Sequence, residues 1–290
     1  MRQECSILQV EDDEITKYEK KKARAIRLLQ NIPLTEGPVE ISYSGGKDSD
    51  VILELAKIAG IPYRAIYKCT TIDPPGTIKH CKEKGAEIIM PKKTFFKLVE
   101  EKGLPSRFAR FCCSELKEYK ILDRAIQGIR RSESIKRAER YKEPEICRVY
   151  GKNSKAKIYL PILDWTDVDV ARFIDERNIK CHPLYYDDKG KFRVERRLGC
   201  IGCPLQSDNG VSDYMKYPKL LKQLIKSTEK WFNTHPNIAS HKRFGNAYNL
   251  VFYCLFCDNY EDYKLKVEDN LFNNDLDTKK FLEDYFKIDL

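Results

Sequence analysis

Residues 41–50, ISYSGGKDSD, combine two glycines, a lysine and three serines directly after an apolar, strand-like run. Gly45 and Gly46 let the backbone take positive φ angles and approach a ligand closely. Successive N–H groups of such a turn, with the positive N-terminus of a following helix, attract an anion. Lys47 would neutralise a phosphate, whereas Asp48 would repel one unless it binds Mg²⁺ or caps the helix. The pattern predicts a phosphate-binding loop that is neither a Walker A loop nor a Gly-x-Gly-x-x-Gly loop. The alternative is an ordinary polar turn.

The cysteines are a second set of residues that could do chemistry. Eleven cysteines without a secretory signal argue against a disulfide framework. Three pairs stand out by their spacing: Cys112 with Cys113, Cys200 with Cys203, and Cys254 with Cys257. By spacing alone, the two Cys-x-x-Cys pairs suit a zinc site. The surroundings of Cys254 and Cys257 are strongly apolar, so these two also fit a buried core pair.

Strands and helices that alternate along the chain must position these residues. Hydrophobic patterns predict strands at 39–44, 62–69, 86–90 and 157–162, and helices at 12–32, 48–60, 77–85, 93–103, 115–126 and 166–179. Such alternation predicts an α/β fold with a doubly wound, mostly parallel, Rossmann-like sheet. We expect an N-terminal helix at 1–38, a nucleotide-binding α/β domain with the cysteine site at 39–205, and a helical C-terminal region at 206–290.

The composition limits the partners and the location. The net charge of +9 favours a polyanionic partner, either a nucleotide or a nucleic acid. The basic stretch 188–197, DKGKFRVERR, has Phe192 among its charges and fits either a polyanion contact or a solvated loop. No apolar run reaches membrane-spanning length, and the N-terminus turns acidic early. We therefore expect a cytoplasmic protein without a membrane partner, and we expect it to form a homo-oligomer.

Four motifs, in order, give the chain a resemblance to a known family. SYSGGKDS, at 42–49, resembles the PP-loop of the ATP pyrophosphatase superfamily, the adenine nucleotide alpha-hydrolases. Three more segments resemble motifs of its phosphoadenosine phosphosulfate (PAPS) reductase branch: TTIDPP at 70–75, GIRRSESIKRA at 128–138 and LPILDWTDVDVARFI at 160–174. The resemblance covers residues 39–205 and implies a fold of the adenine nucleotide alpha-hydrolase type.

The resemblance implies a nucleotide site. Its residues would be Ser42, Ser44, Gly45, Gly46, Lys47, Asp48, Ser49, Thr71, Asp73, Gly128, Arg130, Arg131 and Arg137. The loop would hold the phosphates of ATP, or of a sulfonucleotide, and Thr71 and Asp73 would lie near the adenosine. The arginines would meet phosphate or sulfate oxygens, because the guanidinium fork pairs well with oxyanions. A surface ion pair is the alternative role for each arginine.

The resemblance also groups the cysteines differently. A Cys-Cys pair followed at a distance by Cys-x-x-Cys looks like the [4Fe–4S] ligand set of adenylylsulfate (APS) reductases. Here that set would be Cys112, Cys113, Cys200 and Cys203. Nearby cations would stabilise an anionic cluster: Arg107, Arg110, Lys117, Arg196 and Arg197. Zinc stays the alternative metal.

The chain departs from the reductases in two ways. Those enzymes attack with a cysteine close to the C-terminus, whereas the last cysteine here is Cys257, and they tend to carry a degraded glycine loop. We therefore predict an ATP pyrophosphatase-type enzyme. A substrate oxygen would attack the α-phosphate of ATP with the help of Mg²⁺, and sulfur would then displace the adenylated oxygen on a nucleic acid or nucleotide. Lys47, Asp48 and Arg130 are the predicted catalytic residues, and a sulfur donor or reductant protein is the predicted partner.

Two other functions stay open. One is APS or PAPS reduction with an atypical thiol, Cys254 or Cys257. The other is a non-catalytic, nucleotide-binding accessory subunit.

Overall fold

A computed structural model describes residues 2–34, 37–150, 154–267 and 276–290, with side chains of the first helix described from Glu14 onward. The chain forms two compact units. The first comprises Met1–Cys69, Pro75–Met90 and Glu118–Leu198, and the second comprises Thr70–Pro74, Pro91–Lys117 and Gly199–Leu290. The domain boundaries expected at 38/39 and 205/206 stay a prediction.

A six-stranded sheet lies in the first unit. Its strands, in spatial order, are β3 (Glu87–Ile89), β2 (Tyr63–Lys68), β1 (Val39–Tyr43), β4 (Arg124–Ile126), β6 (Ser154–Tyr159) and β5 (Glu145–Tyr150). Every neighbouring pair is parallel except β5 with β6. The predicted doubly wound, mostly parallel sheet is confirmed. The strand order reverses between β1 and β4, and open α/β sheets bind ligands beyond the carboxyl ends of their strands at such a point.

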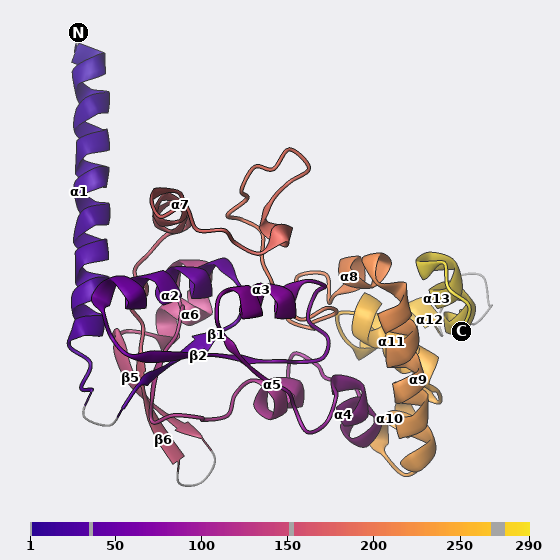
Figure 1. Cartoon of the computed structure of the whole chain (residues 1–290). Helices are drawn as coiled ribbons and strands as arrows, with labels where there is room; N and C mark the ends of the chain where they lie inside the picture. The colour runs from indigo at the N-terminus through magenta and orange to yellow at the C-terminus, as the bar shows by residue number, and fades with distance from the viewer. Residues whose placement is uncertain (1, 35–36, 151–153, 268–275) are drawn as a thin grey trace. The chain divides into compact units, whose positions relative to one another are not determined.

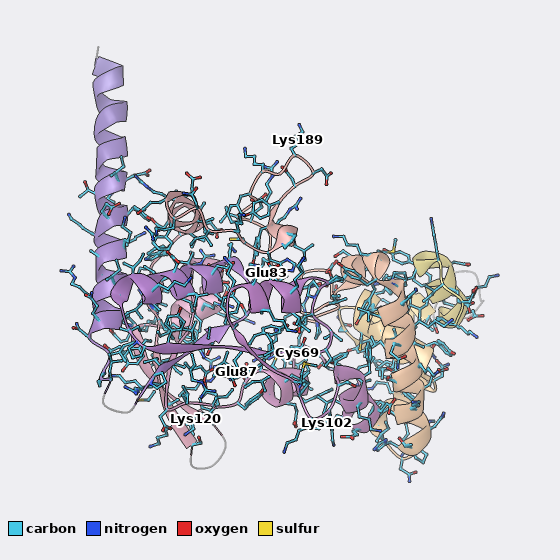
Figure 2. All side chains as sticks on the ribbon, in the orientation of Figure 1. Cys69, Glu83, Glu87, Lys102, Lys120 and Lys189 are labelled. Atoms are coloured by element: carbon cyan, nitrogen blue, oxygen red, sulfur yellow. The ribbon has the colours of Figure 1, made fainter. Side chains whose placement is uncertain are left out.

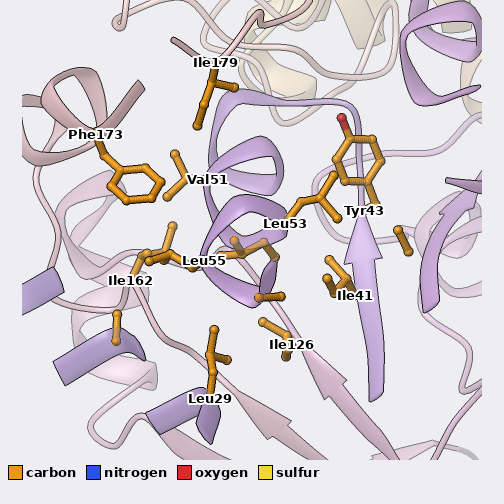
Figure 3. Packing of buried hydrophobic residues seen from close by; sticks show 14 of the residues in the cluster. Leu29, Ile41, Tyr43, Val51, Leu53, Leu55, Ile126, Ile162, Phe173 and Ile179 are labelled. Atoms are coloured by element: carbon orange, nitrogen blue, oxygen red, sulfur yellow. The ribbon is translucent and has the colours of Figure 1, made fainter. Parts of the chain in front are cut away.

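The main hydrophobic core of this unit lies on one face of the sheet. α2 (Lys47–Ala59) covers β1, and α1 (Arg2–Gln30) and α7 (Asp167–Glu176) pack on α2 (Figure 1). Figure 3 shows Val51 of α2 beside Phe173 of α7 in this core. Because the core fixes the first turn of α2 over the end of β1, it also fixes the glycine loop that joins them.

α7 begins where the sequence predicts, at Thr166. The Thr166 hydroxyl accepts a hydrogen bond from the Asp169 amide at 3.3 Å, and the Asp169 carboxylate accepts one from the Thr166 amide at 2.7 Å. This reciprocal capping satisfies two amides that a helix start leaves open. Lys21 of α1 lies 2.7 Å from the same carboxylate and joins α1 to α7.

One prediction of secondary structure was wrong, and one strand was missed. Residues 115–126 do not form a helix: α5 (Phe111–Leu116) ends early, and β4 follows. Helical spacing of the apolar residues in this stretch was outweighed by pairing of β4 with β1 on one side and β6 on the other. β5 was not predicted as a strand, although its residues alternate between exposed and half-buried.

The remaining elements are mostly helices. In the first unit they are α3 (Thr77–Glu83), the 3₁₀ helix η1 (Arg131–Glu133), α6 (Ile135–Arg140) and the 3₁₀ helix η2 (Pro183–Tyr185). The second unit holds α4 (Phe95–Lys102), α5, α8 (Val211–Lys216), α9 (Pro218–Thr234), α10 (Ala239–Phe244), α11 (Ala247–Phe256), α12 (Tyr260–Val267) and α13 (Thr278–Phe286). The predicted helical character after residue 206 is confirmed. Within the described part of the chain, no helix is long and apolar enough to cross a membrane.

The second unit is organised around α4 and α9. Leu98 and Val99 of α4 are buried in one hydrophobic cluster with Leu221 and Leu224 of α9. An ion pair of 2.8 Å between Glu100 and Lys230 joins the same two helices at the surface. This packing positions the loop that leads into α5, and α5 carries the first cysteine pair.

Candidate functional site

The glycine loop is a tight turn between β1 and α2. Gly45 has a φ of +76°, in the left-handed region that favours glycine. Gly46 is the N-cap of α2. The Ser49 hydroxyl donates to the Gly46 carbonyl at 2.7 Å, and Ser44 Oγ lies 3.4 Å from the Gly46 nitrogen. The serines thus fix the turn at the positive end of the α2 dipole, where an anion is stabilised.

Lys47 is held beside this turn by a residue that the sequence did not single out. The Lys47 side chain is buried, and its ammonium lies 5.6 Å from the centre of the Tyr185 ring. The Tyr185 hydroxyl accepts a hydrogen bond from the Leu198 amide at 3.3 Å. Burial raises the pKa of Tyr185 to about 12, so the phenol stays neutral at physiological pH. No sequence motif marks Tyr185, because its position depends on a 3₁₀ turn far along the chain.

Asp48 is neutralised within the protein. Arg130 Nε lies 2.7 Å from Asp48 Oδ1, as an ion pair that is not aligned as a hydrogen bond. The same guanidinium lies 2.8 Å from Asp167 Oδ1 and donates to Ser132 Oγ at 3.1 Å. This pairing explains how a carboxylate can stand in an anion-binding loop. It also means that Arg130 contacts protein carboxylates, so its predicted contact with phosphate stays a prediction.

Gly128 lies at the close contact between the loop after β4 and the start of α2, at the switch point of the sheet. A Cβ atom on Gly128 would lie 2.9 Å from the carbonyl oxygen of Asp48, closer than real Cβ contacts come. The loop after β4 therefore packs directly on the first turn of α2. Glycine is required here for close backbone approach rather than for a positive φ angle.

The other two predicted arginines contact protein groups. Arg131 donates to the carbonyl of Tyr141 at 2.8 Å and pairs with Asp164. Arg137 pairs with Glu133 one helical turn before it. Burial lowers the pKa of Arg137, which nonetheless stays a cation. The sequence identified these residues, but the structure shows ion pairs at both positions.

Three further predicted residues make their described hydrogen bonds outside the glycine loop. The Ser42 hydroxyl donates to Glu40 at 3.1 Å within β1. In the second unit, Thr71 Oγ1 accepts a hydrogen bond from the Phe95 amide at 2.9 Å, and Asp73 accepts one from the Thr70 amide at 2.8 Å. Nucleotide contacts by Ser42, Thr71 and Asp73 stay predictions.

A buried polar network supports the loop, and sequence reasoning missed it. The Tyr43 hydroxyl, at the end of β1, donates to the Asp50 carboxylate in the first turn of α2. His80 Nε2, on α3, lies 3.2 Å from the same carboxylate and 3.2 Å from the Tyr43 hydroxyl. All three side chains are buried. α3 also packs against the loop, because a Cβ on Gly45 would lie 3.3 Å from Cys81 Sγ.

Replacement of Asp50 with alanine is expected to lower the free energy of unfolding by about 3 kcal/mol, because Tyr43 and His80 would lose a shared buried partner. Urea unfolding followed by circular dichroism measures this change. Asp50→Asn keeps an acceptor for Tyr43 and should lose less. An Asp50→Ala midpoint equal to wild type would show that the network contributes no stability.

The basic stretch 188–197 forms a loop whose side chains are largely engaged. The Phe192 ring packs against Tyr185 and Tyr186, with ring centres 5.9 and 5.8 Å apart. Arg193 pairs with Asp187 at 2.6 Å. Figure 2 shows Lys189 at the outer end of this loop. The Phe192 ring is part of the loop's own packing, and a contact of this basic stretch with a polyanion stays a prediction.

The second unit brings the two predicted cysteine pairs together. The pKa of Cys112 is raised by a hydrogen bond with Cys113, by burial and by the neighbouring thiols of Cys200 and Cys203. Burial also raises the pKa of Cys203, with further contributions from Cys200 and Cys113. These mutual influences place the four thiols near one another, and we call them the cysteine group.

A lysine and a threonine border the cysteine group. Lys117 hydrogen-bonds with Cys200; burial alone would lower its pKa, but Cys200 and Asp73 raise it. The Cys200 thiol lies 3.6 Å from Thr70 Oγ1. A buried cation is a favourable neighbour for a group that would hold an anionic cluster. The sequence indicated Lys117 as such a cation.

The Cys-x-x-Cys turn has a fixed shape. Gly202 has a φ of +66°, and a Cβ there would lie 2.1 Å from the Tyr214 ring. The Gly202 amide donates to Asp213 at 2.9 Å. Arg107 donates to the carbonyls of Pro204 at 3.1 Å and Gln206 at 3.0 Å. The turn is thereby tied to the loop that leads to Cys112 and Cys113.

The rival zinc grouping has less support. Burial raises the pKa of Cys254 to about 12, and of the cysteines only Cys257 adds to this shift. Burial raises the pKa of Cys257 to about 11. Cys200 and Cys203 instead interact with Cys112 and Cys113. Among the described residues, no group of three or more His, Cys, Asp or Glu side chains is arranged to hold a metal ion.

Comparisons with known proteins identify the family of the chain. The family model of the phosphoadenosine phosphosulfate reductase domain matches residues 38–206. The uncharacterized protein MJ0973 of Methanocaldococcus jannaschii is 29% identical over 247 residues, which are 80% of this chain and 55% of that protein. The sulfate adenylyltransferase subunit 2 of Shewanella pealeana is 24% identical over 217 residues, which are 61% of this chain and 69% of that subunit. The chain thus spans about half the length of MJ0973.

A solved PAPS reductase from Candida auris superposes with a TM-score of 0.41 and 15% identity, over 61% of this chain and 87% of that one. The family match covers more than half of the chain and includes the glycine loop, Gly128 and both cysteine pairs. This chain therefore belongs to the phosphoadenosine phosphosulfate reductase family.

Proposed function

We propose that this protein is an ATP pyrophosphatase of the PAPS reductase family, which adenylates a substrate oxygen for sulfur transfer to a nucleic acid or nucleotide. The observation that carries the proposal is the intact glycine loop at the switch point between β1 and β4. Two glycines allow its tight backbone turn. Lys47 is buried beside the turn, and Arg130 neutralises Asp48. Such a loop suits the phosphates of ATP.

The residues of the loop have distinct roles in this reaction. A substrate oxygen forms a bond to the α-phosphorus of ATP, the bond to the bridging oxygen of the β-phosphate breaks, and pyrophosphate leaves. Lys47 and the amide of Gly45 stabilise the negative charge on the leaving pyrophosphate. Arg130 holds Asp48 in position. Asp48 is the loop carboxylate to which Mg²⁺ would bind, and the ion would add charge neutralisation.

The cysteine group would hold a [4Fe–4S] cluster through Cys112, Cys113, Cys200 and Cys203. The proposal is supported by the mutual influence of the four thiols and by the buried Lys117 beside them. Four thiols in one group match the number of protein ligands that such a cluster takes.

Sulfonucleotide reduction through Cys254 or Cys257 is less well supported. The attacking species in such a reaction is a thiolate. With pKa values raised by burial to about 12 and about 11, both thiols stay protonated at neutral pH. Neither is therefore a good nucleophile.

The test is product analysis with anaerobically purified protein. With ATP, Mg²⁺, a sulfide source and transfer RNA or DNA as acceptor, we expect release of pyrophosphate. Lys47→Ala should slow this release about 100-fold, because one donor to the leaving group is lost. Lys189→Ala, at an exposed loop end (Figure 2), is the matched control. Sulfite released from APS or PAPS with thioredoxin, and lost in Cys257→Ser, would instead establish a reductase.

A further inference from the structure

One aromatic side chain next to the cysteine group is fully exposed. Phe108 has a relative exposure of 101%, the highest among the exposed large apolar residues of the described chain, and the next, Ile135, has 78%. Phe111, three residues later, packs instead against a core cluster. A phenylalanine loses favourable transfer free energy by standing in water, so this ring contributes nothing to folding.

The turn that presents Phe108 is well defined. The Ser106 amide donates to the Ala109 carbonyl at 3.1 Å, and Ser106 Oγ accepts from the amides of Phe108 and Ala109 at 3.3 and 3.1 Å. Arg107, next to the ring, is bonded to the backbone after Cys203. The Ser106 hydroxyl closes the turn, and Arg107 fixes the residue beside the ring. The ring is therefore already held outward, so a ligand that binds it costs little further conformational entropy.

The ring also lies close to both pairs of the cysteine group, on the segment that leads to Cys112 and beside the segment that follows Cys203. Phe108 precedes Cys112 by four residues. Its neighbour Arg107 donates to the carbonyl of Pro204, the residue directly after Cys203, and to Asn209 Oδ1 at 3.1 Å. Phe108 therefore stands at the rim of the cysteine group within the second unit.

The charges beside the ring favour one class of partner. Arg110 is exposed and makes no ion pair with the described residues, and Arg107, although hydrogen-bonded to uncharged groups, adds a second positive charge. An aromatic ring flanked by guanidinium groups suits a single-stranded nucleic acid, whose bases stack on the ring while its phosphates meet the arginines. A protein partner would need a wider apolar patch than one ring.

We propose that Phe108 is a stacking platform for an unpaired base of a single-stranded RNA or DNA segment, with Arg110 as a phosphate contact, at the rim of the cysteine group. The proposal rests on the proposed function and makes it more specific, because it assigns nucleic acid as the acceptor. Phe192, in the basic stretch 188–197, packs against Tyr185 and Tyr186 and is therefore less available than Phe108 for such stacking.

The test is fluorescence anisotropy with the full-length protein and a labelled single-stranded RNA of about 12 nucleotides. Phe108→Ala should raise the Kd about tenfold, because one stacked base is lost. Phe108→Tyr keeps a flat ring and should bind within about twofold of wild type. Arg110→Ala should weaken binding and reduce its salt dependence. Val149→Ala, at an exposed apolar position on β5 in the other unit, should bind like wild type.

Three outcomes would overturn the proposal: no binding of single-stranded RNA or DNA by wild type, equal affinity for Phe108→Ala and wild type, or a protein partner lost in Phe108→Ala while RNA binding is retained. Pyrophosphate release, measured on the same preparations, keeps the two proposals apart. RNA binding that depends on Phe108, without any ATP cleavage, would support the stacking surface and refute the ATP-dependent reaction.

Discussion

Replacement of Gly128 with alanine is expected to weaken ATP binding by at least about 100-fold. The added methyl group would lie 2.9 Å from the Asp48 carbonyl oxygen. This oxygen belongs to the backbone, so it cannot relieve the clash by changing a rotamer. The loop after β4 or the first turn of α2 must then move, and Arg130 would move away from Asp48. Isothermal titration calorimetry with a non-hydrolysable ATP analogue measures the change in affinity.

The matched control is Gly199→Ala. No atom lies within 4 Å of a Cβ at Gly199, and its φ angle is not in the left-handed region. This variant should bind ATP like wild type, since it changes the same residue type without a collision. Unchanged ATP affinity in a folded Gly128→Ala protein would show that the phosphates do not bind at the switch point between β1 and β4.

Replacement of Cys203 with serine is expected to remove nearly all iron and acid-labile sulfide from anaerobically purified protein. A hydroxyl is a much poorer ligand for iron than a thiolate, and Cys203 belongs to the proposed ligand set. Iron and sulfide assays, with the visible absorption spectrum, measure the loss. Cys147→Ser, at an exposed position on β5, should keep the full content.

The same series decides between the two metal groupings. Cys257→Ser should keep the iron, because Cys257 interacts with Cys254 rather than with the cysteine group. Zinc that is lost from Cys257→Ser and Cys203→Ser but retained by Cys112→Ser would contradict the iron–sulfur proposal. That result would show that the two Cys-x-x-Cys segments bind one zinc ion together.

Local patterns in the sequence predicted most of the fold. β1 and α2 were found because β-branched and aromatic residues precede the glycine turn and helical spacing follows it. β4 was not found, because Arg124–Ile126 is short and its three residues are buried through pairing with β1 and β6. Such pairing is a long-range effect that a local pattern does not contain. The residues of β5 alternate between exposed and half-buried, as in an edge strand. The stretch around β5 is rich in charges, so its sequence did not indicate a strand.

The candidate site was predicted in part for the same reason. Gly45, Lys47 and Asp48 form a continuous motif, so the loop was visible in the sequence. The partner of Asp48 was not, because Arg130 is distant along the chain and any arginine offers the same charge. His80 and Tyr185 belong to no motif at all, and only the folded chain shows one beside Asp50 and the other beside Lys47.

The division into two units has a consequence for the order of folding during synthesis. The second unit consists of three separate chain segments, and its α4 packs on α9. The paired residues Glu100 and Lys230 are 130 positions apart. The ribosome must therefore add about 130 residues after α4 before α9 is available to it, and the apolar face of α4 stays exposed to solvent until then. Closing so long a loop is slow, and a nascent chain with such a delay depends on protection from aggregation.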